Sequence, residues 1–291
     1  MHVILGGTGH VGSATARALL GRGEAVTIVT RDAGRADEWR ETGAELAEAD
    51  INDVAALRKV LRRGRRAFLL NPPADVATDT DAVERRTAAN ILVALAGSGL
   101  EKVVAESTGG AQPGERIGDL SVLWELEEGL RRQPVPAAVN RAGYYMSNWD
   151  GFLDGVCKTG TLPTMYEADM PIPMVAPRDL GEVAAQRLLS SLGDIGIRYV
   201  EGPRRYSAAD VAEAFARALG RPVEVAVTPR GKWRQAFRDM GFSEAAAQSY
   251  AQMTAVSADG GFDMPDDALK GATTLADYIH DLVRRGTGVV G

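Results

Sequence analysis

The sequence of 291 residues has few residues that could form cross-links or metal sites: one cysteine, Cys157, and three histidines. A single cysteine cannot form an intrachain disulfide, and His2, His10 and His280 are too scattered to show the spacing of metal ligands. No apolar run approaches the length needed to cross a bilayer. The formal net charge is -6, from 33 basic and 39 acidic side chains without a basic stripe, which gives nucleic-acid binding no support. We therefore expect a soluble cytoplasmic protein without metal, nucleic-acid or membrane partners.

Strand-like and helix-like segments alternate through the first two-thirds of the sequence. Short apolar runs predict strands at 3–5, 25–30, 44–49, 67–70, 102–105 and 137–140. Amphipathic stretches predict helices at 11–20, 53–63, 79–96 and 120–132. This alternation indicates a parallel sheet covered on both faces, so we predict an α/β fold with a Rossmann-like doubly wound sheet.

A glycine-rich turn, Gly6-Gly7-Thr8-Gly9-His10-Val11-Gly12, joins the first predicted strand to the first predicted helix. Its glycines satisfy the G-x-G-x-x-G spacing, which permits a tight turn, a close approach to a pyrophosphate and close packing of helix on strand. Free N–H groups at the start of the helix would face the anion. We predict cofactor contacts at Gly6, Thr8, Gly9, His10, Val11 and Gly12. The His10 side chain either donates to the phosphates or occupies a tolerant position in the turn.

The end of the second predicted strand favours NADP(H) over NAD(H). Thr30 stands where an NAD site has an acid, and Arg31 and Arg35 follow with guanidinium groups that suit a 2′-phosphate. Asp32 leaves NAD open, because a shift of one residue would restore the acid. The ends of the third and fourth predicted strands lie at the same sheet edge, where we predict further cofactor contacts at Asp50, Ile51, Asn71, Pro72 and Pro73.

The alternation loosens beyond Gly143, where four prolines interrupt residues 160–177. Helices are predicted at 179–190 and 207–219, the second beginning with a capping box formed by Ser207 and Asp210. We expect an NAD(P)-binding domain over 1–150, to which 178–199 returns, and a smaller α+β substrate lobe over 151–291.

Several segments, in order, resemble the NmrA-like atypical short-chain dehydrogenase/reductases. They are residues 6–12, 29–32, 127–130, 140–148 and 172–181, of which 140–148 is similar to the group's R-P-G-x-F-M-E-N segment. The similarity is greatest to the NADPH-dependent quinone reductase type 2 and triphenylmethane reductase branch. The resemblance implies a cleft between a Rossmann-like domain and a small substrate lobe. It also implies NADP(H) contacts from 6–12, Arg31 and 71–73, with Tyr144, Tyr145 and Asn148 near the substrate. Ala142 and Ser147 depart from the Pro and Glu of the group.

No tyrosine in the sequence is followed four positions later by lysine. In typical short-chain dehydrogenases this lysine lowers the tyrosine pKa, so that the phenol can exchange a proton with a carbonyl or alcohol. The helix that usually carries the pair, predicted at 120–132, contains neither residue type. The absence argues against an alcohol dehydrogenase or a sugar-nucleotide epimerase of the usual mechanism.

Two functions stay open. The first is an NADPH-dependent reductase that transfers hydride to an electron-poor carbonyl, quinone or conjugated acceptor, with flat walls for a planar substrate. Candidates for these walls are Trp124, Tyr144, Tyr145 and Trp149, unless these aromatic residues only pack the core. Ser107, Thr108 and Tyr144 are candidates to bond the acceptor oxygen, although the two hydroxyls could equally cap their loop. The second function is a non-catalytic NADP(H)-binding redox sensor with a protein partner. The substrate and the oligomeric state, a homodimer included, stay undetermined.

Overall fold

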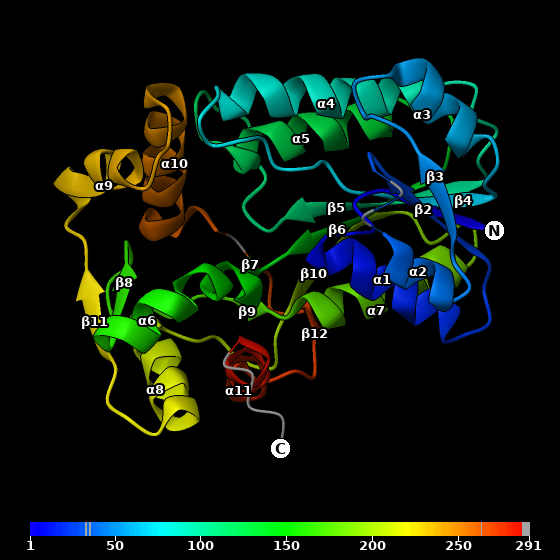
Figure 1. Cartoon of the computed structure of the whole chain (residues 1–291). Helices are drawn as coiled ribbons and strands as arrows, with labels where there is room; N and C mark the ends of the chain where they lie inside the picture. The colour runs from blue at the N-terminus through cyan, green and yellow to red at the C-terminus, as the bar shows by residue number, and fades with distance from the viewer. Residues whose placement is uncertain (33, 35, 263, 287–291) are drawn as a thin grey trace.

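The computed structural model describes residues 1–32, 34, 36–262 and 264–286, and its centre is an eight-stranded sheet (Figure 1). The strand order is β12-β10-β6-β5-β4-β1-β2-β3, and every neighbouring pair is parallel. The strands are β1 (His2–Ile4), β2 (Val26–Thr30), β3 (Glu45–Glu48), β4 (Arg66–Leu69), β5 (Lys102–Thr108), β6 (Ala137–Ala142), β10 (Gly196–Glu201) and β12 (Leu269–Lys270). The predicted Rossmann-like doubly wound sheet is confirmed. All carboxyl ends of the strands meet at one edge.

Helices cover both faces of this sheet (Figure 1). One face carries α3 (Val54–Leu61), α4 (Thr80–Leu95) and α5 (Asp119–Arg131), and the other carries α1 (His10–Leu20), α2 (Asp37–Glu41) and α7 (Pro177–Leu189). Alternate residues of β5 divide between the two apolar cores: Val103 and Ala105 join the first, and Val104 joins the second. The near-continuous apolar character of the strands follows from this burial on both faces.

The second lobe lies to the left in Figure 1 and has its own apolar core. Its helices are α6 (Leu153–Thr159), α8 (Ala208–Leu219), α9 (Trp233–Asp239), α10 (Glu244–Val256) and α11 (Leu275–Gly286). Two small parallel sheets pair β8 (Thr161–Thr164) with β11 (Glu224–Val227), and β7 (Tyr144–Tyr145) with β9 (Met174–Val175). Short helical turns occur at η2 (Met146–Phe152), η3 (Arg230–Lys232) and η4 (Ser257–Gly261). Between segments of this lobe, the chain returns to the central sheet with α7 and β10. Helix α10 of the second lobe also contacts α4.

Local signals explain where several helices begin. Ser207 and Asp210 form the expected capping box at the start of α8. Pro177 opens α7 two residues before the predicted start, as its fixed φ and missing N–H allow at the first helical position. None of the helices in the described residues is both long and apolar enough to span a bilayer.

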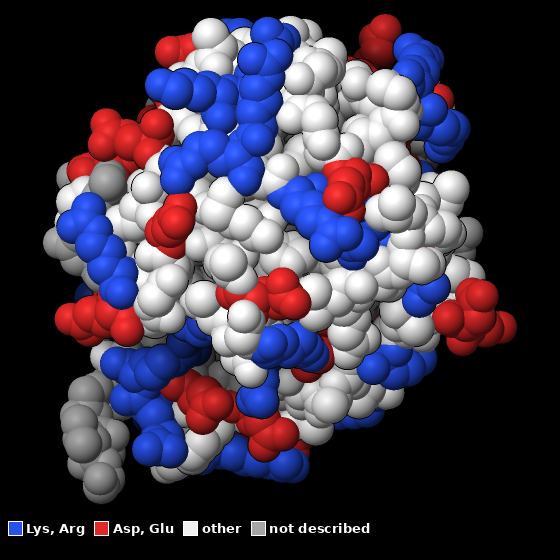
Figure 2. Space-filling view, turned by 90° about the vertical axis from the view of Figure 1, so that its right-hand side faces the viewer, with Lys and Arg blue, Asp and Glu red and all other residues white. Residues whose placement is uncertain are grey.

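Charged side chains of both signs are interspersed over the surface. Arg63 pairs with Glu45 at 2.8 Å, and Arg65 pairs with Glu101 at 2.7 Å. Figure 2 shows, on one face, small groups of basic side chains separated by acidic and uncharged ones.

A buried charge cluster lies at the amino end of β5. The Lys102 and Arg187 side chains are 0% and 2% exposed, and both face Asp194, with N···O distances of 3.7 and 3.2 Å. Arg198 adds a third cation at 3.0 Å, and the Ser190 hydroxyl donates to Asp194 at 2.7 Å. Although partial burial alone would raise it, the Ser190 hydrogen bond and the Arg187 charge hold the pKa of Asp194 below its usual range. One carboxylate therefore compensates the buried cations.

We expect Asp194→Asn to lower the free energy of unfolding by about 3 kcal/mol, because it leaves Lys102 and Arg187 buried without a counter-charge. The matched control is Asp154→Asn, which removes an exposed pair with Lys158 and should cost less than about 0.5 kcal/mol. Urea denaturation at neutral pH measures both variants. Equal losses would contradict the role given to Asp194.

Candidate cofactor and acceptor site

The glycine turn after β1 leaves no room for side chains at two positions. Gly6 has a φ of +68°, a left-handed conformation that favours glycine. A Cβ on Gly12 would lie 2.2 Å from the Gly6 carbonyl oxygen. The first turn of α1 therefore packs directly against the preceding loop, as a dinucleotide-binding turn requires.

The start of α1 lacks a side-chain cap among the described residues, with Gly9 at its N-cap. By contrast, Asp53 caps α3 and Asp79 caps α4, each accepting a backbone N–H three residues on. The turn also follows the strand that lies between β2 and β4, where the sheet order reverses. Uncapped N–H groups at this point can hold an anion, so the predicted pyrophosphate site fits the structure.

The predicted nucleotide-specificity residues lie at the end of β2. Thr30 is the last residue of the strand, and Arg31 and Asp32 follow it as exposed residues. The Asp32 carboxylate accepts the Gly34 N–H at 2.9 Å, so one of its oxygens holds its own loop. Arg35 lies outside the described residues.

The other predicted cofactor residues line the same sheet edge but are partly engaged within their loops. Asp50 accepts both the backbone N–H and the side-chain amide of Asn52, at 2.8 and 3.0 Å, and Ile51 is half-buried against the core. Asn71 donates to the Glu84 carbonyl at 3.0 Å and accepts the Thr87 hydroxyl at 2.7 Å. These bonds fix the loop that continues into Pro72, which is half-buried, and Pro73, which is exposed.

The hydroxyls at the end of β5 face opposite sides of the sheet. Ser107 is buried and donates to Glu127 on α5 at 2.5 Å, and Arg141 pairs with the same carboxylate at 2.6 Å. Ser107 is thus committed to an internal network. Thr108 is half-buried and ends the strand beside Gly109, so of the two hydroxyls it is the one nearer the sheet edge.

The structure reveals a carboxyl pair that the sequence analysis missed. Glu84 on α4 is 3% exposed, accepts the Ala74 N–H at 2.8 Å and lies within hydrogen-bonding distance of Asp119, the first residue of α5. Burial first, and then the negative charges of Asp119 and Asp81, raise the pKa of Glu84 to about 8. Glu84 therefore holds a proton at neutral pH. No sequence signal pointed to this pairing, because Glu84 and Asp119 lie on two different helices, 35 residues apart.

Asp119 is the solvent-exposed member of this pair. The residue is exposed, yet crowding by protein atoms raises the pKa of its carboxyl group. Charged and titratable groups near the pair are Asp81 and Arg85 from α4, Tyr250 from α10 and Tyr145 from β7.

Within the described residues, no cluster of three or more His, Cys, Asp or Glu side chains is placed to hold a metal ion. A carboxyl pair that shares one proton can instead store and donate that proton.

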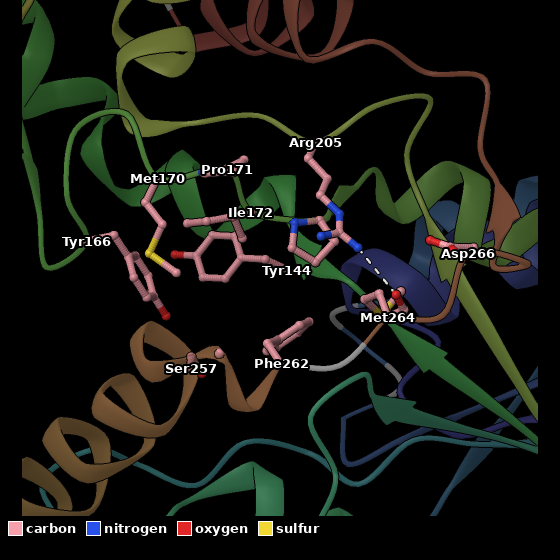
Figure 3. Close-up of a pocket in the computed structure, with 12 residues that line it drawn as sticks. Tyr144, Tyr166, Met170, Pro171, Ile172, Arg205, Ser257, Phe262, Met264 and Asp266 are labelled. Carbon is pink, nitrogen blue, oxygen red and sulfur yellow. Dashed lines mark hydrogen bonds between the residues drawn. The ribbon is translucent and has the colours of Figure 1, made fainter.

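A pocket of about 410 Å³ lies at the junction of the two lobes (Figure 3). Its lining residues come from distant parts of the chain: Tyr144, Tyr166, Met170, Pro171, Ile172, Pro173, Arg205, Ser257, Gly260, Phe262, Met264 and Asp266. Tyr144 is the second residue after the end of β6. On the other side, Gly109 directly follows β5, and a Cβ there would lie 2.5 Å from the Met264 sulfur. The pocket therefore borders the carboxyl ends of β5 and β6.

The predicted substrate residues separate into two groups. Tyr144 lines the pocket beside Tyr166 (Figure 3), and the two rings are 6.2 Å apart in an edge-on arrangement. The ring of Trp149 lies 5.8 Å from that of Tyr144. Trp149 is 2% exposed and belongs to the core of the second lobe, behind Tyr144. Burial raises the pKa of Tyr144, and a hydrogen bond with Asn148 lowers it by a smaller amount. The net rise is the opposite of the effect that a neighbouring lysine would have.

The remaining aromatic candidates lie outside this pocket. Tyr145 is half-buried against the core under α1 and α7, and burial together with the charges of Glu106 and Asp119 raises its pKa. Trp124 is half-buried on α5 and is absent from the pocket lining.

The uncapped α1 start, the parallel sheet and the pocket at its carboxyl edge define a Rossmann-like α/β protein with an attached second lobe. The sequence matches the NmrA-like family over residues 2–279, and the chain belongs to this family.

Known proteins of similar sequence or fold include reductases. The chain is 25% identical over 257 residues to an NAD(P)H azoreductase of Xenophilus azovorans, covering 88% of this chain and 87% of that protein. The NADPH complex of the Escherichia coli quinone oxidoreductase QOR2 has 19% identity and a TM-score of 0.80, covering 97% and 99% of the two chains. The NADP(H) complex of Citrobacter sp. triphenylmethane reductase has 16% identity and a TM-score of 0.79, with the same coverage. The two structures share the fold of this chain.

We expect Glu84→Gln to make stability less dependent on pH. A carboxyl group with a raised folded-state pKa keeps its proton while the unfolded chain releases it, so stability falls as pH rises from about 4.5 to about 8. A glutamine amide can donate to Asp119 and accept from Ala74, as the protonated acid does. Relative to the parent, the variant should gain about 1–3 kcal/mol between about pH 5 and about pH 8.5.

Chemical denaturation across this pH range measures the effect, with Glu125→Gln as the control, since Glu125 pairs with Arg85 at the surface. Parallel pH profiles for the parent and Glu84→Gln would rule out a raised Glu84 pKa.

Proposed function

We propose that this chain is a cytoplasmic NADPH-dependent reductase that transfers hydride to an electron-poor carbonyl, quinone or conjugated acceptor without a Tyr-x-x-x-Lys pair. The observation that carries the proposal is the uncapped, glycine-lined start of α1, which borders the same sheet edge as an aromatic pocket. The azoreductase similarity over most of the chain supports it.

The chain would hold the cofactor through its backbone. N–H groups at residues 10–12 would bind the diphosphate, Arg31 would pair with the 2′-phosphate, and the loop from Asn71 to Pro73 would contact the ribose. When bound, NADPH supplies the hydride. The preference for NADP(H) rests on Arg31, because Asp32 is engaged with the Gly34 N–H.

The pocket would orient the acceptor against the carboxyl ends of β5 and β6. Tyr144, Tyr166 and Phe262 offer aromatic surfaces to a planar molecule, and Met264 closes the pocket against Gly109. Positioning in such a pocket contributes much of the rate when the acceptor itself spreads the charge that it gains. Such acceptors depend less on a dedicated tyrosine.

A quinone or azo acceptor takes up a proton as well as a hydride. Asp119 and Glu84 together hold a proton at neutral pH, and Asp119 is open to solvent, from which the pair would regain it. A cationic dye that accepts only hydride would not need it.

The test is a spectrophotometric assay of purified protein with NADPH and a panel of neutral quinones. Oxidation of NADPH that depends on the acceptor supports the reductase. Tight NADP(H) binding without turnover of any acceptor would overturn it and favour the alternative, a redox sensor with a protein partner.

We expect Gly12→Ala to weaken NADPH binding by roughly 30-fold or more, because the new methyl group displaces the Gly6 carbonyl and the turn that receives the diphosphate. Gly155→Ala is the control, since a Cβ there meets no atom within 4 Å. Calorimetric titration measures both, with circular dichroism to verify folding. Unchanged binding by folded Gly12→Ala would exclude the turn as the cofactor site.

We expect Arg31→Gln to weaken NADPH binding by about tenfold and to leave NADH binding within about twofold, because only NADPH carries the 2′-phosphate. The exposed Arg132, beyond the end of α5, provides the control variant Arg132→Gln. Equal losses for the two nucleotides would remove Arg31 as the specificity residue.

A further inference from the structure

Arg205 provides a cationic end to an otherwise aromatic and aliphatic pocket (Figure 3). It lies in the loop between β10 and α8, and its side chain is 47% exposed. One guanidinium N–H donates to the Met264 carbonyl at 3.3 Å, as the dashed line in Figure 3 marks. Met264 is buried against Gly109, so this bond anchors the guanidinium at the pocket wall.

The nearest carboxylate to Arg205 already has a cation of its own. Glu201 is 2% exposed and is bonded to Lys270, whereas its second oxygen lies 3.7 Å from Arg205, beyond hydrogen-bonding distance. Lys270 and Arg205 thus share one buried carboxylate, and Glu201 forms its hydrogen bond with Lys270 alone. Asp266 also lines the pocket, and no ion pair of the described residues joins it to Arg205.

A guanidinium group has five N–H donors in a planar fork that matches the oxygens of a carboxylate or sulfonate. Arg205 commits one of its N–H groups to Met264. The others lie at the pocket wall, at the opposite end from Tyr166 in Figure 3. A concave wall also strengthens the field of a single charge compared with an open surface.

We propose that this pocket binds planar aromatic acceptors that carry a carboxylate or sulfonate group, with Arg205 bonding the anionic group and the rings of Tyr144, Tyr166 and Phe262 contacting the aromatic plane. That these molecules are reduced rests on the proposed reductase function. That they bind in the pocket does not depend on it. Neutral acceptors of the same shape would bind less well, and cationic dyes would be disfavoured.

Binding of two non-reducible probes tests the anion site without turnover. Naphthalene-2-sulfonate is charged, and naphthalene-2-sulfonamide has nearly the same shape without the charge. Calorimetric titration should give about tenfold tighter binding of the sulfonate to the parent protein. Arg205→Gln should remove this preference, and Arg205→Lys should keep part of it, because lysine retains the charge without the planar fork.

Two further variants control for general charge effects. Arg204→Gln alters the neighbouring arginine, which bonds Asp210 and is not part of the pocket lining, and should leave both probes unchanged. Asp266→Asn removes a negative charge from the lining and should tighten sulfonate binding by about two- to fivefold. Equal binding of the two probes, or a sulfonate preference that survives in folded Arg205→Gln, would overturn the proposal.

A phosphate group of the cofactor is the other anion that Arg205 could contact. NADPH titration should therefore give the same affinity for Arg205→Gln as for the parent, and a loss would assign Arg205 to the cofactor instead. Turnover of neutral quinones without a sulfonate preference would defeat this inference alone. A preference that depends on Arg205 without turnover of any acceptor would defeat only the proposed function.

Discussion

The close contact between Gly12 and the Gly6 carbonyl is the constraint on which the rest of the site depends. It brings the start of α1 directly against the loop that follows β1, and no side chain caps the first amides of this helix. The helices that begin beside it use Asp53 and Asp79 to satisfy their own first N–H groups. The uncapped start of α1 leaves such groups for an anionic ligand.

Buried charged groups at the two edges of the sheet differ in their partners: opposite charges meet at the amino edge, and two carboxyl groups meet at the carboxyl edge. At the amino edge, Asp194 compensates Lys102 and Arg187, and this arrangement serves stability, because each ion has a partner. At the carboxyl edge, Glu84 and Asp119 face one another with the same sign of charge, which is tolerable only while a proton stays between them. Carboxyl groups with strongly shifted pKa values are common at functional sites.

The acceptor pocket depends on contacts between segments that are far apart in the sequence. Gly109 follows β5, yet it packs on Met264, and Met264 in turn anchors Arg205 from the loop after β10. The lobe boundary therefore sets the pocket composition, and the sheet sets only its position. Such a division allows one sheet to be combined with different ligand sites through changes in a second lobe.

The sequence by itself determined the sheet and the glycine turn. Hydrophobic periodicity, segment length and turn residues located β1 to β6 and the helices α1, α3, α4 and α5 to within a few residues, since buried parallel strands and amphipathic helices have strong local patterns. The short helix α2 was not predicted, because five residues are too few to show a period. The capping box at Ser207 was equally readable, because its partners are three residues apart.

Tertiary structure alone decided which polar groups meet. It turned Ser107 toward Glu127, placed Trp149 in a core, paired Glu84 with Asp119 and brought Arg205 to Met264. Each of these contacts joins residues on different elements, which are too far apart in the sequence for a helical or strand period to relate them. Packing across elements, which fixes burial and charge environment, has no short-range signature in the chain.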